Sequence, residues 1–401
     1  MKLFHKIYVI LFVAFFACGG AFVLLSAQED YSKNENRYLE KRPDFSWESY
    51  RKGEYQDALE KALTDQFPMR DVLTGLSTTY RKLAGLHDVG DVYLGKDHFY
   101  LDKKLEKDIS ASQYGKNLAA VKKFRDTYSP NLKLMLVPSP ATVMKDKLPY
   151  LSKIYDEAPY VKTAKEMFGE GFLDVRGEME KVSDPDSVGP DSFMEVLGGS
   201  SDRKDDGNLY FRTDHHWTHR GAFAGFTAYQ RAMGITPEAM SRRYTYRVVS
   251  EDFLGTMYSR ALDNGAEADT IAIPDVPENL VVKAGEKEIP FYDMDKLKEK
   301  DQYAVYFGGN YPEVTITHSS SSGSAEIEGM CGKKLLIFKD SFANSLVPLL
   351  TREYDEIKMI DLRYETRPMS MLMKQYQPDD VLVLYEFTTF AQSTEVARLG
   401  I

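Results

Sequence analysis

Cysteine is almost missing from this chain of 401 residues: Cys18 lies in an apolar run near the start, and Cys331 lies far from it in the C-terminal part. Two cysteines so placed exclude a disulfide framework, a CxxC redox pair and a thiolate metal site within one folded domain. Packing must therefore stabilise the fold. Cytosolic proteins and secreted bacterial proteins without disulfides both fit this composition, so the cysteine content leaves the cellular compartment open.

Positive charge is also scarce, because 51 Lys and Arg residues face 61 Asp and Glu residues, and the formal net charge is −10. A protein that binds nucleic acid needs clustered Lys and Arg side chains that displace counterions from the phosphate backbone. We therefore expect no nucleic-acid partner. The hydrophobic content of 43% is sufficient for a full-sized core in one large domain or two moderate ones.

One hydrophobic run, residues 7–27, is long enough to cross a bilayer as a helix. Lys2 and Lys6 precede it, and Glu29 and Asp30 follow it at once. Positive charge on the N-terminal flank orients the following chain outward. We interpret residues 1–28 as an uncleaved membrane anchor, which predicts a single-pass protein of the bacterial cell membrane with the rest of the chain outside.

Two other interpretations of this segment stay open. Ser26 and Ala27 end the run with small residues, as at a signal-peptide cleavage site, and cleavage there would make the protein secreted. The string 16–19 around Cys18 has a weak likeness to a lipoprotein cleavage site, although the apolar run continues beyond it.

Helical and extended patterns divide the rest of the chain. Residues 29–88 are polar and have helical periodicity at 50–63 and 72–86, so we interpret them as a juxtamembrane helical stalk. Residues 89–401 alternate amphipathic stretches with short apolar runs, which is typical of an α/β fold with a mainly parallel sheet. The predicted strands are 133–137, 334–338, 357–360 and 381–385, and the predicted helices are 110–128, 218–233, 342–352 and 367–376.

The stretch of residues 240–324 differs from its surroundings. It has short alternating segments, many turn residues and the serine-rich run 319–324. We interpret it as an irregular β-containing insertion within the catalytic domain. In parallel α/β sheets the active site lies at the carboxyl ends of the strands. Residues directly after the predicted strands are therefore the first candidates for chemistry.

The densest polar cluster is the string 213–220 (TDHHWTHR), which contains three of the seven histidines. If the chain is extended there, Asp214 and His216 point to the same side, because alternate residues of an extended chain share a face. A carboxylate that holds one imidazole nitrogen fixes the tautomer, leaves the other nitrogen free as a base and stabilises the imidazolium. The pair therefore predicts a general base.

A base of this kind needs a nucleophile, and Ser341 offers one at the junction of a predicted strand and a predicted helix. A serine at such a turn is exposed at the end of the strand, where backbone N–H groups of the helix start can stabilise an oxyanion. The chain order Asp, His, Ser is acceptable, because the same triad geometry occurs in several sequence orders.

Other roles for these residues are open on the sequence alone. A serine or aspartate just before a helix is most often an N-cap, which applies to Ser341 and to Asp214. His215, His216 and His219 have spacings that would share one helical face and could bind a metal ion, although no HExxH pattern accompanies them. The three histidines could also be structural.

The strings 213–218 (TDHHWT) and 339–345 (KDSFANS) together resemble the DHHW family, which is related to the SGNH-hydrolase-like domains of alginate O-acetylation proteins. The resemblance extends over most of the chain beyond the anchor. It implies an SGNH-hydrolase-like three-layer α/β fold and a permuted catalytic triad. Carried over to this sequence, the triad falls on Asp214, His216 and Ser341.

Two further positions could stabilise an oxyanion or bind the substrate. Arg363, with Tyr364 beside it, follows a predicted strand at the same sheet edge as the serine, and its guanidinium could stabilise negative charge or hold an acidic sugar. An ordinary ion pair with Asp361 or Glu365 is the alternative. Asn310 follows two glycines that permit close backbone approach, although most such strings are simple turns.

The neighbours of the two proposed triad residues could also contact a ligand. Trp217 could stack on a sugar ring, or its ring could lie in the core. His215 points away from His216 in an extended segment, where it could make a supporting hydrogen bond.

The predicted function is O-acetylation of a cell-surface or secreted polysaccharide through an acetyl-serine intermediate, with no metal or other cofactor. A membrane-bound protein could donate the acetyl group. A carbohydrate acetylesterase with the same triad is one alternative, because transferase and hydrolase differ only in the exclusion of water and the placement of the acceptor. A catalytically silent glycan-binding scaffold of an exopolysaccharide assembly is the other.

Overall fold

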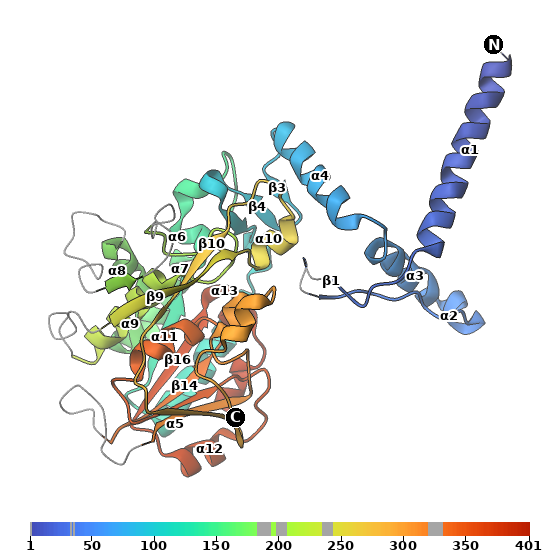
Figure 1. Cartoon of the computed structure of the whole chain (residues 1–401). Coiled ribbons are helices and arrows are strands. Elements are labelled where there is room, and N and C mark those ends of the chain that lie inside the picture. The colour runs from blue at the N-terminus through green and yellow to red at the C-terminus, as the bar shows by residue number, and fades with distance from the viewer. Residues whose placement is uncertain are drawn as a thin grey trace. The chain divides into compact units, whose positions relative to one another are not determined.

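The computed structural model of the chain describes residues 2–32, 34, 37–182, 194–197, 207–234, 244–319 and 332–401. The chain divides into two compact units, Met1–Leu86 with Ser259–Asn264, and His87–Tyr258 with Gly265–Ile401 (Figure 1). Cys331 and most of the serine-rich run, residues 320–324, lie outside the described residues.

The first unit begins with the predicted hydrophobic helix, α1 (Lys2–Leu25). Within it, Phe4–Val23 is long and apolar enough to cross a membrane, and none of this stretch is buried by other parts of the protein. The short strands β1 (Tyr31–Ser32) and β2 (Arg37–Tyr38) pair antiparallel after it. These features are those expected of an N-terminal membrane anchor or a signal segment.

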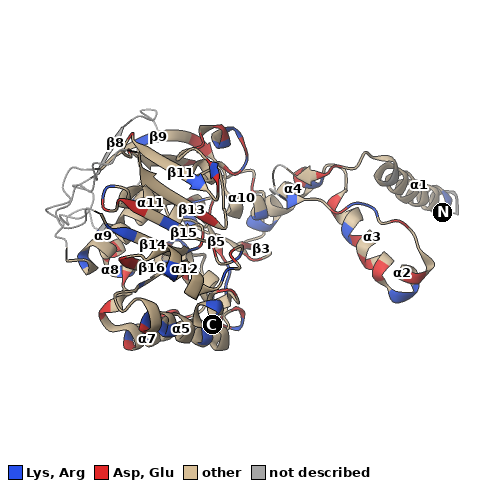
Figure 2. Ribbon diagram, turned by 90° about the horizontal axis from the view of Figure 1, so that it is seen from below, with Lys and Arg blue, Asp and Glu red and all other residues tan. Residues whose placement is uncertain are grey.

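Three helices complete the first unit: α2 (Trp47–Lys52), α3 (Glu54–Asp65) and α4 (Arg70–Leu83). The single helix expected at 50–63 is instead broken into α2 and α3 at Gly53. This glycine has φ of 83°, a left-handed conformation that ends α2 and that glycine adopts at little cost. Acidic and basic side chains are interspersed along α2 and α3 (Figure 2).

An eight-stranded sheet forms the centre of the second unit, in the order β12-β11-β13-β15-β14-β16-β6-β7. The five strands from β15 to β7 are parallel, and each join from β12 to β15 is antiparallel. The strands are β6 (Lys133–Val137), β7 (Phe172–Leu173), β11 (Leu280–Ala284), β12 (Lys287–Glu288), β13 (Glu313–His318), β14 (Lys334–Lys339), β15 (Glu356–Ile360) and β16 (Asp380–Glu386). The predicted, mainly parallel α/β sheet is confirmed.

Helices cover both faces of this sheet, so the unit has three layers (Figure 1). Leu335 and Ile337 of β14 face one core with α8 (Val175–Val182), α9 (His219–Ala232) and α11 (Ala343–Leu350). Leu336 and Phe338 face the opposite core. The helices on that second face are α5 (Ala111–Tyr128), α7 (Ala158–Phe168), α12 (Met369–Tyr376) and α13 (Phe387–Gln392).

Two smaller sheets and two short helices complete the second unit. One sheet consists of β3 (Asp88–Val89), β4 (Val92–Leu94) and β5 (Tyr100–Asp102), and the other of β8 (Met194–Leu197), β9 (Tyr244–Phe253) and β10 (Asp269–Pro274). The short helices are α6 (Pro140–Val143) and α10 (Thr256–Ala261). The last residues of α10, from Ser259 on, belong to the first unit. The stretch 240–324 therefore supplies β9 to β13, and its strands β11 to β13 extend the main sheet.

Candidate active site

Asp214 and His216 lie in a tight loop directly before α9. Tyr210 and Trp217 pair across the base of this loop, and the Phe211 N–H donates to the His216 carbonyl. Between them residues 212–216 bend, and the His216 N–H turns back to Asp214 Oδ1, so the extended segment expected here is wrong. The Asp214 carboxylate accepts a hydrogen bond from His216 Nδ1 at 2.5 Å. Both side chains are buried, with 3% and 6% of their residue surface exposed. The helix itself begins after Thr218, whose hydroxyl accepts from the Arg220 N–H.

Ser341 lies in the turn between β14 and α11, at the carboxyl edge of the parallel strands. Its Oγ is 2.8 Å from Nε2 of His216, although 125 residues separate the two in sequence. The buried carboxylate of Asp340 fixes the turn, because it accepts from the backbone N–H of Phe342 and of Glu386. Among the described residues, the Ser341 N–H makes no hydrogen bond. The structure thus brings together the three residues that the sequence grouped.

The charges in this row of side chains follow from burial and from close neighbours. Burial opposes ionisation of Asp214, but electrostatic interactions with His215 and His216 and the hydrogen bonds from His216 and the Thr256 N–H hold its pKa below the usual range. Burial and the charge of His215 lower the pKa of His216 to about 4 despite the neighbouring carboxylate. At neutral pH the row is a carboxylate, a neutral imidazole and a hydroxyl, which is the state that a general base requires.

Tyr303, which the sequence analysis did not single out, contacts both His216 and the serine turn. Its ring stacks on the His216 imidazole, with centroids 3.8 Å apart and planes 9° from parallel. Its hydroxyl donates to the Ser341 carbonyl at 3.2 Å and to Ser345 Oγ at 3.0 Å. The residue is 5% exposed. No local pattern marks this tyrosine among the 26 of the chain, because its contacts with His216 and Ser341 join segments that are distant in sequence.

Backbone from the end of β9 supports Asp214 on its other side. The second carboxylate oxygen accepts the Thr256 N–H at 2.8 Å. Gly255 lies against Asp214 so closely that a Cβ at this position would overlap the aspartate side chain. The preceding Thr213 is held by Asp269, whose pKa burial raises to about 6. A glycine before a threonine was the available sequence signal, but it is too common to single out.

Trp217 is completely buried, so its ring offers no face to a sugar. The indole N–H donates to Ser345 Oγ at 2.7 Å and to the Phe342 carbonyl at 3.1 Å. The tryptophan therefore joins the loop before α9 to the first turn of α11. Of the two interpretations of Trp217, the core position is the one observed, because the bulky ring fills the space between α9 and α11.

Asn310 is exposed near the carboxyl edge of the sheet, where a buried lysine fixes its amide. Its Oδ1 accepts from Lys339 Nζ at 3.1 Å and from Asn344 Nδ2 at 3.4 Å. Lys339 Nζ also donates to Asn344 Oδ1 at 2.8 Å. Burial lowers the pKa of Lys339 to about 8. Because both partners donate to the oxygen of Asn310, its N–H groups are directed away from them.

Arg363 makes the ion pair that was the alternative to a catalytic role. Its Nε and Nη2 donate to the two oxygens of the buried Asp361 at 3.0 and 2.6 Å. The guanidinium side chain is 44% exposed and lies over the ring of Tyr364, 5.3 Å from the centroid. Tyr364 is itself exposed. Neither residue has a hydrogen bond to Ser341 or His216.

His215 is partly exposed beside Asp214 and His216, and its ring centroid is 4.0 Å from that of His216, so the expectation that it points away from His216 is wrong. Within the described part of the chain, one group could hold a metal ion: Asp214, His215 and His216, with ligand atoms within 4.8 Å of one another. His219 is not in it. The proposed cluster with His219 assumed one helical face, but α9 begins only at His219. Both ring nitrogens of His216 are already hydrogen bonded, so a metal ion there would displace Asp214 or Ser341.

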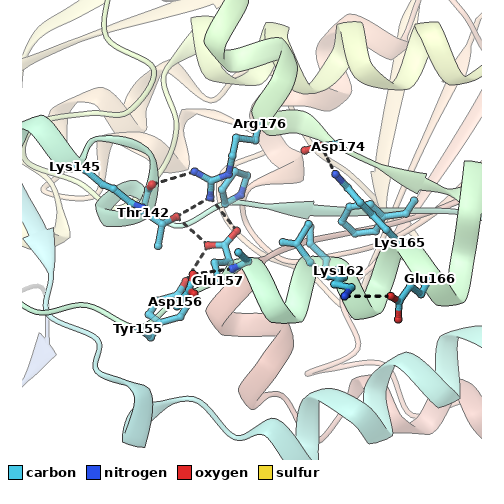
Figure 3. A pocket seen from close by; sticks show the side chains of 15 residues that line it. Thr142, Lys145, Tyr155, Asp156, Glu157, Lys162, Lys165, Glu166, Asp174 and Arg176 are labelled. Carbon is cyan, nitrogen blue, oxygen red and sulfur yellow. Dashed lines mark hydrogen bonds and ion pairs between the residues drawn. The ribbon is translucent and has the colours of Figure 1, made fainter.

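Two cavities lie farther along the carboxyl edge of the sheet. A cavity of about 80 Å³ is bordered by His215, Ser139, Tyr155 and Thr389, among others. A larger one of about 460 Å³ lies beyond Tyr155, which borders both (Figure 3). Its polar lining carries four cationic and four acidic side chains: Lys145, Lys162, Lys165, Arg176, Asp156, Glu157, Glu166 and Asp174.

Comparison with known protein families gives a match to the DHHW family model, described as DHHW protein, over residues 199–360. This matched range contains the Asp214-His215-His216-Trp217 string and Ser341. The predicted resemblance to the DHHW family is confirmed over that range. The comparison with curated protein sequences found no match.

Solved structures share the fold at low sequence identity. A DHHW family protein from Eubacterium siraeum is 19% identical, with coverage of 77% of this chain and 93% of that one and a TM-score of 0.54. Bacillus cereus PatB1 with a sulfonyl adduct is 16% identical, with coverage of 76% and 98% and a TM-score of 0.52. A second PatB1 structure is 17% identical, with coverage of 75% and 97% and the same TM-score. The predicted SGNH-hydrolase-like three-layer α/β fold is confirmed.

Proposed function

From the match of residues 199–360 to the DHHW family, we propose that this chain is an extracytoplasmic, serine-dependent acyl-transfer enzyme that O-acetylates a cell-surface or secreted polysaccharide. One observation carries the proposal: an unbroken hydrogen-bonded row runs from Asp214 through His216 to Ser341. A purely structural set of polar residues does not require a partly exposed serine at the end of such a row.

In the proposed mechanism, His216 Nε2 takes the proton of Ser341 as Oγ attacks the acetyl carbonyl of the donor. The tetrahedral intermediate collapses, the donor oxygen leaves with the proton from the imidazolium, and acetyl-serine remains. A sugar hydroxyl then gives its proton to His216 and attacks the acetyl-serine carbonyl. The second tetrahedral intermediate collapses as the bond to Ser341 Oγ breaks and Oγ takes the proton from the imidazolium, which releases the acetylated sugar and restores the serine. Asp214 holds the imidazole tautomer and stabilises the imidazolium in both halves of the reaction.

Negative charge on the tetrahedral intermediate needs hydrogen-bond donors. The Ser341 N–H is one proposed donor, because it has no other described partner. We assign the Asn310 amide as the second donor, since Lys339 and Asn344 engage its oxygen and leave its N–H groups available. Arg363 is held by Asp361 and is proposed only as a contact for the substrate, with Tyr364.

The proposed arrangement of the whole chain has three parts. Residues 1–28 anchor the protein in the bacterial membrane, residues 29–88 form a stalk, and residues 89–401 form the catalytic domain outside the membrane, with an insertion at about 240–324. Cleavage after the apolar run would release the same catalytic domain. A membrane-bound protein is the proposed source of the acetyl group, because the anchor confines the enzyme to the same surface.

A serine-directed label tests the nucleophile. PatB1 was solved with a sulfonyl adduct, so we choose a sulfonyl fluoride and a fluorophosphonate as probes. We expect both to label the wild type, and Ser341→Ala to abolish the labelling and the release of p-nitrophenol from p-nitrophenyl acetate. Ser345→Ala is the matched control, because Ser345 is a buried serine four residues away that bonds to Tyr303 and Trp217 instead of His216.

The alternatives predict different outcomes. A catalytically silent scaffold would leave the wild type unlabelled and without esterase activity. A metal-dependent enzyme would lose activity to a chelator while Ser341→Ala retained it. Addition of oligosaccharide acceptors separates transferase from acetylesterase: a transferase forms acetylated sugar as p-nitrophenol is released, whereas an acetylesterase forms acetate only.

A further inference from the structure

The segment after α1 folds back onto the C-terminal end of this hydrophobic helix. The guanidinium of Arg42 donates through Nη2 to the carbonyls of Val23 at 2.7 Å and Ser26 at 3.4 Å. The Arg42 backbone N–H donates to the side chain of Gln28. A cation that bonds to free carbonyls at a helix C-terminus satisfies groups that otherwise need water. Arg42 therefore holds its neighbours beside the end of the membrane-length helix.

A cluster of exposed aromatic rings follows within a few residues of Arg42. The Phe45 ring lies 5.2 Å from Trp47, 6.0 Å from Tyr50 and 5.2 Å from Tyr55, measured between centroids. Phe45 is 54% exposed, Trp47 66% and Tyr50 44%. These rings contact one another while much of their surface faces outward. We name Phe45, Trp47 and Tyr50 the aromatic cluster.

Aromatic residues in such a position fit the boundary between lipid and water. Trp and Tyr concentrate at the ends of membrane spans, where an apolar ring meets acyl chains and its polar atom meets headgroups and water. The aromatic cluster lies near the point where Phe4–Val23 ends, which is the same boundary. A solvent-exposed set of large rings is otherwise rare on a soluble surface.

Basic and acidic side chains nearly balance around the aromatic cluster, with four basic and five acidic residues in 40–57, and two of the lysines form ion pairs. Lys41 bonds to Asp30 at 2.6 Å, and Lys52 bonds to Glu48 at 2.7 Å. Paired charges give little attraction to anionic headgroups, in contrast to polybasic segments. Contact with the membrane would therefore depend on the rings and hardly on lipid charge.

We propose that the aromatic cluster inserts into the headgroup region of the outer leaflet and forms a second membrane contact beside α1. The occupant of this surface is the lipid interface of the membrane that α1 crosses. The contact holds α2 at the membrane surface and fixes where the stalk begins. The proposal requires that α1 is not removed by cleavage, and it is independent of the proposed acyl-transfer chemistry.

The two tryptophans of the chain make a direct test feasible, because Trp47 is exposed and Trp217 is completely buried. The full chain is reconstituted into phosphatidylcholine vesicles with and without bromine on the acyl chains, close to the headgroups. We expect the brominated lipid to quench the wild-type emission and Trp47→Phe to remove that quenching. Equal quenching in the wild type and in Trp47→Phe, or none in either, would overturn the proposal.

Further variants separate the lipid from other occupants. Phe45→Ala and Tyr50→Ala are expected to reduce the quenching of Trp47, whereas Tyr150→Ala, at a still more exposed aromatic position in the other unit, leaves it unchanged. Replacement of half of the lipid by phosphatidylglycerol should not increase the quenching. Trp47 emission that is blue-shifted only at high protein density, and is insensitive to brominated lipid, would identify a second copy as the occupant and contradict the proposal.

Retention of esterase activity in Trp47→Phe shows that the variant is folded. If the wild type is active but brominated lipid does not quench Trp47, the membrane contact alone is rejected. Absence of serine labelling with intact quenching would reject the proposed chemistry alone.

Discussion

At His216 the protonation state follows from opposing electrostatic effects. Desolvation and the charge of His215 disfavour the imidazolium, and the Asp214 carboxylate favours it. Because the first two prevail, the neutral base persists well below neutral pH. The same balance keeps the imidazolium high in energy, which favours return of the proton to the leaving group.

We expect kcat/KM for p-nitrophenyl acetate to stay level from neutral pH down to about pH 5 and then to decrease as His216 gains a proton, with a pKa of about 4. The sign follows from the role of His216 as a base, since protonation at low pH removes its free lone pair. Initial rates in buffers of constant ionic strength measure this profile, and Trp217 emission at each pH monitors the fold. A midpoint near the ordinary histidine value of about 6.5 would contradict the buried environment of this base.

Tyr303 supports a second prediction at this scale, because its ring covers the imidazole face. An aromatic face stabilises an adjacent cation by about 0.5–2 kcal/mol, so loss of the ring should disfavour the imidazolium that forms during reaction. We expect Tyr303→Leu to lower kcat about tenfold with little change in KM. Tyr303→Phe keeps the ring and should retain most of the activity.

The pH profile separates this role from a general loss of packing. Because loss of the ring disfavours the imidazolium, Tyr303→Leu should move the midpoint of the low-pH decrease in kcat/KM to lower pH. Tyr303→Phe should leave this midpoint in place despite the loss of the hydroxyl bonds to Ser341 and Ser345. Equal losses in both variants with unchanged midpoints would show that the hydroxyl, and not the stacked ring, is the important group.

At the scale of elements, the site depends on turns that join strands to helices. The turn at Ser341 was predictable, because the apolar run 334–338 and the helical pattern after it are local signals. The loop at Asp214 was predictable for the same reason, since Thr218 caps a clear helix. Both turns lie where a short apolar run is followed by a pattern of helical period.

Other elements were beyond local patterns. Strands β11 to β13 extend the sheet antiparallel, and their pairing depends on contacts between distant segments. The contacts of Tyr303 with His216 and of Gly255 with Asp214 also join distant segments, so local patterns could not predict them. The break at Gly53 had a local signal, because glycine within a helical pattern weakens the helix, but only its left-handed φ makes it a terminus.

The turn between β9 and α10 carries a prediction, because it passes against Asp214 without space for a Cβ at Gly255. We expect Gly255→Ala to displace the aspartate from His216 and to lower kcat/KM by about 10²-fold or more, as small misplacements of catalytic groups do. Gly115→Ala in α5 is the matched control, since nothing lies within 4 Å of its added Cβ. That variant should keep full activity and gain about 0.5–1 kcal/mol of stability.

Thermal unfolding and esterase kinetics on both glycine variants measure these effects. Gly255→Ala with normal activity would show that Asp214 is not held by this turn. A loss of activity in Gly115→Ala would show that α5 influences the site by a route other than packing.

At the scale of the whole molecule, charge bears on which polysaccharides the proposed enzyme would accept. The chain has a formal net charge of −10, and the cavity of Figure 3 has equal numbers of cationic and acidic side chains. Several of these side chains already pair with each other, such as Lys165 with Asp174 at 2.6 Å. Parallel strands lie about 4.8 Å apart, so the cavity beside β6 and β7 is about 10–15 Å from Ser341 along the sheet edge. A neutral oligosaccharide a few units long spans this distance without electrostatic repulsion.

We therefore expect neutral cello-oligosaccharides to accept acetyl groups with higher kcat/KM than oligouronates of equal length, most clearly at low ionic strength, where repulsion of a polyanion is least screened. Lys162→Ala, at the rim of the cavity, should raise KM for the neutral acceptor and leave p-nitrophenyl acetate hydrolysis unchanged. Lys116→Ala, an exposed lysine of α5 that does not border the cavity, is the control and should alter neither. An acceptor that lies in this cavity must contact its rim. A preference for oligouronates, or an unchanged KM in Lys162→Ala, would therefore mean that the acceptor extends away from Ser341 along a different part of the surface.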